Sequence, residues 1–241
     1  METFTTPTAF TVGFEKLELE SSRYFIPAYA RHRPACQAFL EGRYFEPKTH
    51  ALMGLLLHSW PGSVVHAGTF FGDMLPSFAA KSPSLVYAFE PVLENYVLAR
   101  LCIEHNALKN VALFNSALGA SIGVSFMATG NADGQHRGGS SQVAETGQIT
   151  TCVSLDSFSI DDLAVIQLDV EGSERAALQG AQATIRRNSP VVLIEDNNGD
   201  CDIFLDEIGY ERVGDIPGLT MWAPFDKAAD AQRLLLKVNT G

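Results

Sequence analysis

Basic residues are scarce in this chain of 241 residues. Lysine and arginine together number 17, against 28 aspartates and glutamates, so the formal net charge is −11. An acidic surface of this kind repels phosphate backbones and anionic lipid headgroups. We therefore expect neither a nucleic-acid partner nor membrane association.

Long apolar runs and paired cysteines are also missing. The longest apolar stretch, near Leu52 to Leu57, is far too short to span a bilayer. The N-terminus lacks the basic-then-apolar pattern of a signal peptide. The four cysteines, Cys36, Cys102, Cys152 and Cys201, include no Cys-x-x-Cys pair. These absences predict a cytoplasmic protein with reduced thiols.

What the sequence does contain is a regular alternation of apolar runs with helix-like segments. The runs predict strands at residues 63–67, 85–89, 111–114, 165–168 and 190–194, with helices between them, one of these over 174–186. A strand followed by a crossover helix pairs in parallel within its sheet. Two further runs, 210–213 and 220–223, favour a C-terminal antiparallel hairpin. We expect an α/β fold with a doubly wound, mostly parallel sheet.

Two segments fall outside this alternation. Residues 1–45 are rich in aromatics but show no sustained period, which favours irregular structure with short helices. We expect this segment to form a lid or an arm between two copies of the chain, and residues 46–241 to form the main domain. Residues 128–142 have almost no apolar side chain, so we expect a mobile loop there. The runs at 124–127 and 149–153 would flank it as an inserted hairpin.

Glycines and one carboxylate stand where a parallel sheet binds ligands, beyond the carboxyl ends of its strands. Gly68 and Gly72 follow the first expected strand, and such a turn lets backbone N–H groups approach a ligand closely. Glu90 ends the second strand, where a carboxylate can accept hydrogen bonds from ribose hydroxyls. Together these residues indicate a cofactor that contains adenosine. The alternative is that the glycines serve helix packing and that Glu90 is solvated.

Several short segments follow one another in a distinctive order between Gly42 and Glu195. They are Gly42 to Pro47, Val65 to Gly72, Ala88 to Pro91, Asn115 to Gly119, Ser154 to Phe158, Leu168 to Glu174 and Leu193 to Glu195. This order resembles that of the FkbM-type methyltransferases, most distinctively at Asp169-Val170-Glu171-Gly172. The resemblance implies a Rossmann-like class I methyltransferase fold, S-adenosylmethionine as methyl donor, and a hydroxylated small molecule such as a sugar or polyketide as acceptor.

The resemblance also implies site residues. Donor contacts are expected from His66, Gly68, Thr69, Gly72, Glu90, Pro91, Ser116, Ala117 and Asp169. Methyl transfer to oxygen needs a positioned nucleophile that loses its proton, so Asp169 and Glu171 are the catalytic candidates. The alternative is that both carboxylates only cap the helix that follows them.

The chain departs from the family pattern in its first turn. The family pattern is Asp-x-Gly-Ala-Asn-x-Gly, and here His66 replaces the acidic residue, Thr69 the alanine and Phe70 the asparagine. Gln167 stands where a lysine is usual. A neutral or protonated imidazole attracts the cationic donor less than a carboxylate does, although Asp73 could partly substitute. A catalytically silent binding or scaffold domain therefore stays open as an alternative. A NAD-dependent enzyme is disfavoured because no Gly-x-Gly-x-x-Gly is present.

Two further features bear on the acceptor. Asp169 together with Asp196 and Asn197 resembles the metal-binding arrangement of catechol-type O-methyltransferases, and such oxygen ligands suit Mg²⁺ or Ca²⁺. Against a metal, Gly172 stands where that family has a lysine, and Asp-Asn is also ordinary turn chemistry. His136, in the expected loop, is a second side chain that could be carried to the acceptor.

Overall fold

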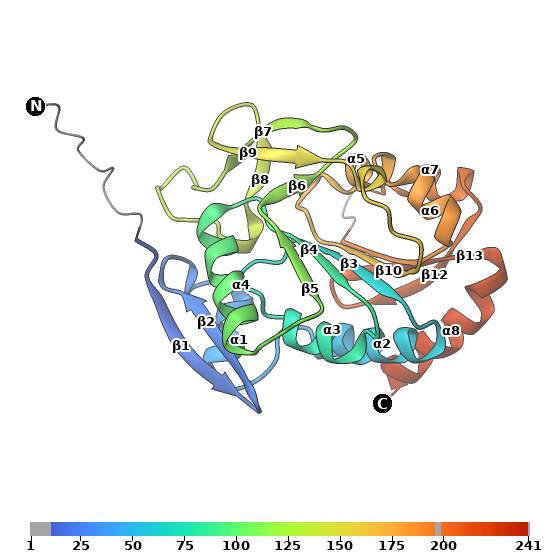
Figure 1. Cartoon of the computed structure of the whole chain (residues 1–241), viewed down its shortest axis with the longest axis horizontal. Helices are drawn as coiled ribbons and strands as arrows, with labels where there is room; N and C mark the ends of the chain where they lie inside the picture. The colour runs from blue at the N-terminus through green and yellow to red at the C-terminus, as the bar shows by residue number, and fades with distance from the viewer. Residues whose placement is uncertain (1–10, 196–198, 241) are drawn as a thin grey trace, which may run out of the picture.

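The fold is described here from a computed structural model that covers residues 11–195 and 199–240. Its centre is a seven-stranded sheet of order β12-β13-β11-β10-β3-β4-β5 (Figure 1). The strands are β3 Ser63–Ala67, β4 Val86–Phe89, β5 Val111–Phe114, β10 Leu163–Leu168, β11 Val191–Ile194, β12 Tyr210–Ile216 and β13 Leu219–Pro224. Strands β3, β4, β5, β10 and β11 pair in parallel, and β13 runs antiparallel to both of its neighbours. The expected doubly wound sheet with its C-terminal hairpin is confirmed.

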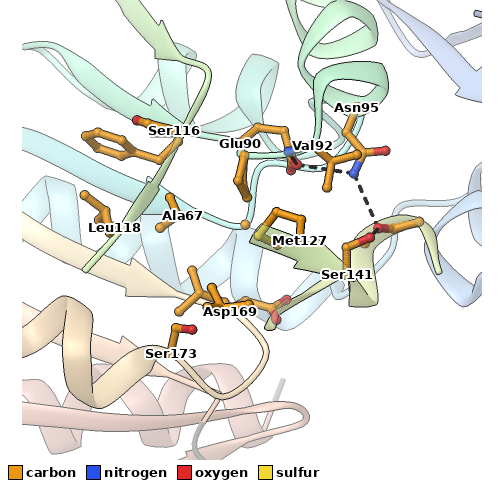
Figure 2. Close-up of a pocket in the computed structure, with 18 residues that line it drawn as sticks. Ala67, Glu90, Val92, Asn95, Ser116, Leu118, Met127, Ser141, Asp169 and Ser173 are labelled. Atoms are coloured by element: carbon orange, nitrogen blue, oxygen red, sulfur yellow. Dashed lines mark hydrogen bonds between the residues drawn. The ribbon is translucent and has the colours of Figure 1, made fainter. Parts of the chain in front are cut away.

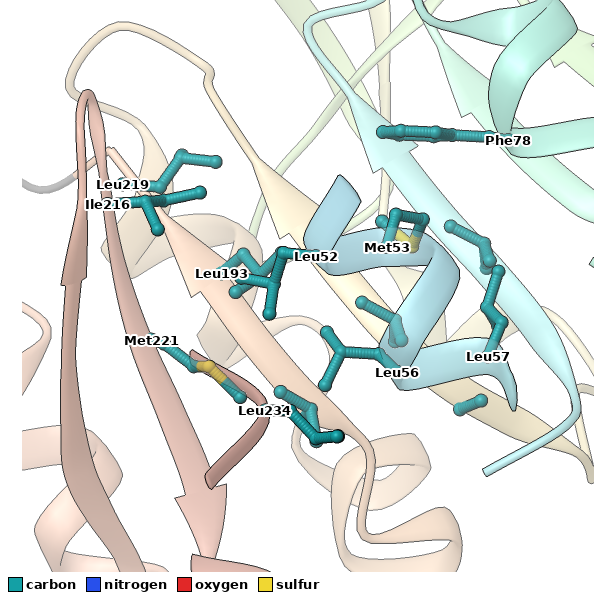
Figure 3. Packing of buried hydrophobic residues seen from close by; sticks show 14 of the residues in the cluster. Leu52, Met53, Leu56, Leu57, Phe78, Leu193, Ile216, Leu219, Met221 and Leu234 are labelled. Atoms are coloured by element: carbon teal, nitrogen blue, oxygen red, sulfur yellow. The ribbon is translucent and has the colours of Figure 1, made fainter. Parts of the chain in front are cut away.

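Helices cover both faces of this sheet. One face carries α2 Pro47–Ser59, α3 Leu75–Lys81 and α8 Phe225–Thr240, and the other carries α5 Glu174–Gln179, α6 Gln182–Asn188 and α7 Asp202–Glu207 (Figure 1). Buried strand residues alternate between the faces, as Val64 and Val65 do. On the first face Leu52 and Leu56 of α2 pack near Leu193 of β11 (Figure 3). Burying each such side chain stabilises the fold by about 1.5–3 kcal/mol.

Two helical features differ from the expectation. The helix expected over 174–186 is divided into α5 and α6 around Gly180. A Cβ atom on Gly180 would lie 2.0 Å from the carbonyl oxygen of Gly119, so the close approach of that carbonyl requires glycine. The C-terminal helix α8 was not predicted, although its buried residues recur at helical spacing on one face: Ala228, Ala231, Leu234, Leu235 and Val238.

The N-terminal segment is more regular than expected. Strands β1 Phe14–Leu19 and β2 Ser22–Pro27 form an antiparallel hairpin, followed by η1 Ala28–Ala30 and α1 Pro34–Leu40. Irregular structure was therefore wrong for the hairpin, while the short helices are confirmed. The residues of β2 from Tyr24 onward are all buried, several of them against α4 Leu93–His105, so this strand lacks the alternation that would have revealed it. Residues 1–10 lie outside the described residues, and the division at residue 45 stays a prediction.

The inserted hairpin is confirmed and is part of a second sheet. Strands β7 Gly123–Ala128 and β9 Gln148–Val153 pair antiparallel, and β6 Ser116–Leu118 and β8 Gln142–Ala144 complete the order β6-β9-β7-β8. The segment 129–141 connects β7 to β8 and contains the short helix η2 Gly138–Ser140. Within it Gly138 and Ser141 are buried, so the loop packs on the protein; its mobility stays a prediction. No helix in the described part of the chain is long and apolar enough to cross a membrane.

Candidate active site

Two neighbouring pockets open at the carboxyl edge of the large sheet. The first, the apolar pocket, is walled largely by apolar side chains: Ala67, Phe89, Val92, Ala117, Leu118, Met127, Val143 and Val170 (Figure 2). The second, the acidic pocket, is lined in part by residues at the starts of α1, α2 and α3. Gly68, Gly139 and Asp169 line both pockets, so the two meet at these residues.

The glycine turn after β3 is built around Gly68. This residue has φ +91°, and a Cβ on it would lie 1.9 Å from the carbonyl oxygen of Asp169. Only glycine lets the end of β3 pass so close to the end of β10. Gly72 also has positive φ, but it packs against α4, and Thr69 is buried with its hydroxyl on the carbonyl of His66. Gly68 therefore reaches the pockets, whereas Thr69 and Gly72 shape the turn behind it.

Glu90 is buried rather than solvated, with 3% of its surface exposed. One carboxylate oxygen accepts a hydrogen bond from the backbone N–H of Phe70 at 2.8 Å. The other accepts from the backbone N–H of Val92 at 2.9 Å and from the amide of Asn95 at 3.3 Å (Figure 2). Burial raises its pKa to about 7. A carboxylate offers about four acceptor positions, so one remains free for a donor group in the pocket.

Three other expected donor contacts, Pro91, Ser116 and Ala117, also line the apolar pocket. The Ser116 hydroxyl is buried and has no hydrogen-bond partner among the described residues. A buried polar group without a partner costs free energy unless a ligand satisfies it. This hydroxyl and the free acceptor position of Glu90 give an otherwise apolar pocket the polar groups that a nucleoside needs.

Carboxylates converge on the acidic pocket from separate parts of the chain: Glu46, Asp73, Asp169, Glu171 and Glu195. Asp169 is partly buried, and its carboxyl shares a hydrogen bond with the Glu195 side chain; desolvation and then this partner raise the pKa of Asp169 well above the usual range. Burial and the Glu195 charge likewise raise the pKa of Glu171. One oxygen from each of these three residues lies within 4.8 Å of the others, a spacing that also suits a divalent cation.

The other predicted metal ligands, Asp196 and Asn197, lie outside the described residues. Glu195, which sequence reasoning passed over as a site residue, is the first residue after β11. No side chain of the residues that the structure describes caps α5 by a hydrogen bond, so neither Asp169 nor Glu171 caps this helix, and Glu174, the first residue of α5, holds the loop before it. Its carboxylate accepts hydrogen bonds from the backbone N–H groups of Val170 and Gly172.

The backbone around the acidic pocket is strained. Glu46, Phe70 and Glu171 line this pocket, and all three have positive φ, at 48°, 49° and 54°. Such values are unfavourable for residues with a side chain and persist where the surrounding structure enforces them. Half of the six non-glycine residues with positive φ in the described part of the chain thus lie at this site. Strain of this kind is typical of functional sites.

Two of the four departures from the family pattern, His66 and Gln167, contact each other. They lie side by side on β3 and β10, and the Nδ1 atom of His66 is hydrogen-bonded to Oε1 of Gln167. Both are buried, and burial lowers the pKa of His66 to about 4, so its imidazole is neutral. His66, Gln167 and Asp73 all line the acidic pocket, and Asp73 is also buried. It places a carboxylate in the pocket although position 66 lacks one.

Two segments cover the site. A Cβ on Gly138 would lie 2.7 Å from Cβ of Ala30 and 3.2 Å from the Phe70 ring, so the segment 129–141 packs closely between the N-terminal segment and the glycine turn. The amide of Asn95 donates to the carbonyl of Gly138 at 3.4 Å and accepts from the Tyr29 hydroxyl at 2.8 Å. Asn95 therefore joins both covering segments to Glu90.

The structure gives His136 a different position from the one expected. Its ring packs against Tyr29 with centroids 4.4 Å apart, and its Nδ1 atom accepts a hydrogen bond from the backbone N–H of Gly138. It lines neither pocket. His136 holds the covering segment in place in this structure, and the hypothesis that the loop carries it to the acceptor stays a prediction.

Comparison with known proteins identifies the family. The family model described as Methyltransferase FkbM domain matches residues 66–212, which is more than half of the chain. The chain belongs to the FkbM methyltransferase family. It is accordingly a methyltransferase that depends on S-adenosylmethionine, and the expected class I fold is confirmed. No curated protein matches the chain.

Solved structures related to this FkbM methyltransferase are distant in sequence. Methyltransferase FkbM from Methylobacillus flagellatus is 16% identical over 68% of this chain, with a TM-score of 0.49; the match spans only 43% of the length of that protein. TYW2 of M. jannaschii, solved in complex with AdoMet, is 12% identical over 89% of this chain and 85% of its own, with a TM-score of 0.48. A putative O-methyltransferase from Klebsiella pneumoniae is 11% identical over 80% of this chain and 68% of its own length, with a TM-score of 0.40.

Proposed function

We propose that this protein transfers a methyl group from S-adenosylmethionine to a hydroxyl oxygen of a small metabolite or sugar. The adenosine part of the donor occupies the apolar pocket. Its amino-acid end passes Gly68 and Asp169 into the acidic pocket, where the acceptor also binds. The observation that carries this proposal is the junction of the two pockets at the partly buried carboxyl group of Asp169, which is hydrogen-bonded to Glu195.

The residues of the apolar pocket suit an adenosine. The free acceptor position of Glu90 receives a ribose hydroxyl, and the orphaned hydroxyl of Ser116 gains a partner. Apolar side chains such as Met127 and Leu118 line this pocket (Figure 2), and they would enclose the adenine ring and exclude water. The bound donor supplies a methyl group on a positively charged sulfur. The carboxylates of the acidic pocket stabilise that charge, Asp73 in the place of an acidic residue at 66.

Proton removal falls to the pair formed by Asp169 and Glu195. Because the two carboxyl groups share a hydrogen bond, the pair holds one proton and keeps one negative charge. It can therefore take the proton of an acceptor hydroxyl. The acceptor's oxygen–hydrogen bond breaks, a carbon–oxygen bond forms as the carbon–sulfur bond breaks, and S-adenosylhomocysteine leaves. Glu171 lies beside the pair and adds negative charge.

The test combines donor binding with turnover. Calorimetry should give binding of S-adenosylmethionine and S-adenosylhomocysteine and no response to NAD. Formation of S-adenosylhomocysteine is then measured with a panel of sugars and with the matched amino sugars. We expect turnover with hydroxyl acceptors, and Asp169→Asn should reduce it by about 10²–10⁴-fold while changing donor affinity far less. Asp161→Asn, at the exposed opposite end of β10, is the matched control and should be silent.

Three outcomes contradict the proposal in different ways. Absence of donor binding at millimolar concentration would favour a silent scaffold domain. Turnover restricted to the amino sugars would move the methylated atom from oxygen to nitrogen. Loss of turnover with a chelator, restored by Mg²⁺, would replace the base by a cation held at Asp169, Glu171 and Glu195.

A further inference from the structure

Arg33 is the one basic side chain that lines the acidic pocket in the described part of the chain, where His66 is neutral. It immediately precedes α1, in the N-terminal segment, and is partly buried. A Cβ on Gly138 would lie 3.1 Å from Cγ of Arg33, so the arginine stem packs under the covering segment. Its guanidinium therefore stands at the site and not on the open surface.

The Arg33 guanidinium is uncommitted. No carboxylate of residues 11–195 and 199–240 forms an ion pair with it within 4.0 Å. Glu171 is close enough for Arg33 to oppose the rise of its pKa, but the two side chains form no ion pair within 4.0 Å. Arg31, two residues earlier, behaves differently, because it pairs with Glu15 on the hairpin. A partly buried guanidinium without a partner, facing a cavity, is suited to an anion that arrives with a ligand.

The donor brings one such anion. Its amino-acid end carries a carboxylate and an ammonium group, and in the arrangement proposed above this end enters the acidic pocket beside Gly68. The ammonium group finds carboxylates on several sides of that pocket. The donor's own carboxylate is repelled by the same residues, and Arg33 is the side chain that can pair with it.

We propose that Arg33 binds the α-carboxylate of the donor's amino-acid end. The inference rests on the proposed placement of the donor across the two pockets. It gives the N-terminal segment a specific role, because the segment then completes the donor site and is held down by the bound donor. It also explains how a strongly acidic pocket accepts a ligand that carries a carboxylate.

The test compares two ligands that differ in the amino-acid end. S-adenosylhomocysteine carries the α-carboxylate, and 5′-methylthioadenosine keeps the adenosine and the sulfur but lacks it. Arg33→Gln should lower the affinity for S-adenosylhomocysteine by about 10- to 100-fold, which is the loss expected for a charge-assisted bidentate contact. The affinity for 5′-methylthioadenosine should change less than about twofold. Arg33→Lys, which keeps the charge without the planar fork, should recover part of the loss.

Controls separate this inference from the function proposed above. Arg31→Gln, on an exposed residue of the same segment, should leave both affinities unchanged. Binding of 5′-methylthioadenosine shows that the Arg33 variant is folded. If wild-type protein binds S-adenosylhomocysteine and Arg33→Gln binds it equally well, the Arg33 assignment is wrong while the donor placement survives. If Arg33→Gln lowers the affinity for S-adenosylhomocysteine and for 5′-methylthioadenosine alike, Arg33 supports the fold and does not bind the α-carboxylate. Wild-type protein that binds neither ligand would overturn the donor placement itself.

Discussion

Replacing Glu90 by glutamine separates donor recognition from fold stability. The carboxylate accepts hydrogen bonds from N–H groups on both oxygens, with Phe70 on one side and Val92 on the other. A glutamine amide has the same shape but must turn its NH₂ group toward one of these donors. The buried site then contains two donors that face each other, and the acceptor position available to a ribose hydroxyl is altered.

Two opposing contributions decide the effect on stability. An unsatisfied donor in a buried site costs about 1–3 kcal/mol. The rise in the pKa of Glu90 from 4.5 to about 7 corresponds to about 3 kcal/mol, which the ionised side chain costs the fold above pH 7 and which glutamine avoids. At pH 8 the two contributions nearly cancel. We therefore expect the unfolding free energy of Glu90→Gln to stay within about 2 kcal/mol of wild type.

Donor affinity has no such compensation. Loss of a charged acceptor for the ribose should weaken the binding of S-adenosylhomocysteine by about 1–3 kcal/mol, or roughly 5- to 150-fold in affinity. Calorimetry at pH 8 measures the affinity, and urea denaturation measures the stability. Glu104→Gln, on the exposed C-terminal end of α4, is the control and should change neither. Unchanged affinity in Glu90→Gln would refute the ribose role, and a large loss of stability would show that the carboxylate mainly holds the glycine turn.

Two further predictions concern buried polar groups. Burial and Glu46 raise the pKa of Asp73 from 3.8 to about 7, so the folded protein retains a proton that the unfolded chain loses earlier, and stability without ligand should fall as the pH rises from about 4 to about 7. Asp73→Asn should make this dependence shallower in thermal melts by the share of one carboxyl group, because Glu90 and Asp169 also have raised pKa values. His66→Asp alone buries an unpaired carboxylate and should destabilise the fold by about 3–5 kcal/mol, whereas adding Gln167→Lys should restore about 0.5–3 kcal/mol in a double-mutant cycle measured by urea denaturation. A pH dependence in Asp73→Asn as steep as in wild type, or strictly additive effects in the cycle, would contradict these two interpretations.

The sheet and its glycine turn could be predicted because local signals and tertiary structure agree there. Parallel strands buried on both faces are apolar runs, and Val191–Ile194 is fully buried along its length. The end of such a run marks the carboxyl edge, which is why Gly68, Glu90 and Asp169 were found from the sequence. Each of them directly follows the last residue of a strand.

The acidic pocket could be predicted only in part, because much of it is assembled by packing. Glu46 and Arg33 come from a segment whose position over the sheet depends on the contact of β2 with α4, and no periodicity in the sequence encodes that contact. Asn95 lies inside a helix, where a buried polar residue gives no signal of its hydrogen bonds to two other segments. Glu195 carried a readable signal, since it follows an apolar strand directly, but the Asp-Asn pair after it had the more familiar metal-ligand pattern.

The contact between His66 and Gln167 changes what the departures from the family pattern mean. Taken separately in the sequence, a histidine in place of an acid and a glutamine in place of a lysine suggest a donor turn that is losing its function. In the structure they are neighbours on adjacent strands, and the exchange replaces a pair of opposite charges by a neutral hydrogen-bonded pair. A buried site tolerates either pair, whereas one member of each would leave a charge without a partner. The pocket has meanwhile kept the carboxylates of Asp73 and Asp169 for a cationic ligand. Because a matched pair keeps the fold stable whether or not the site works, the departures at His66 and Gln167 are not by themselves a sign of a silent scaffold.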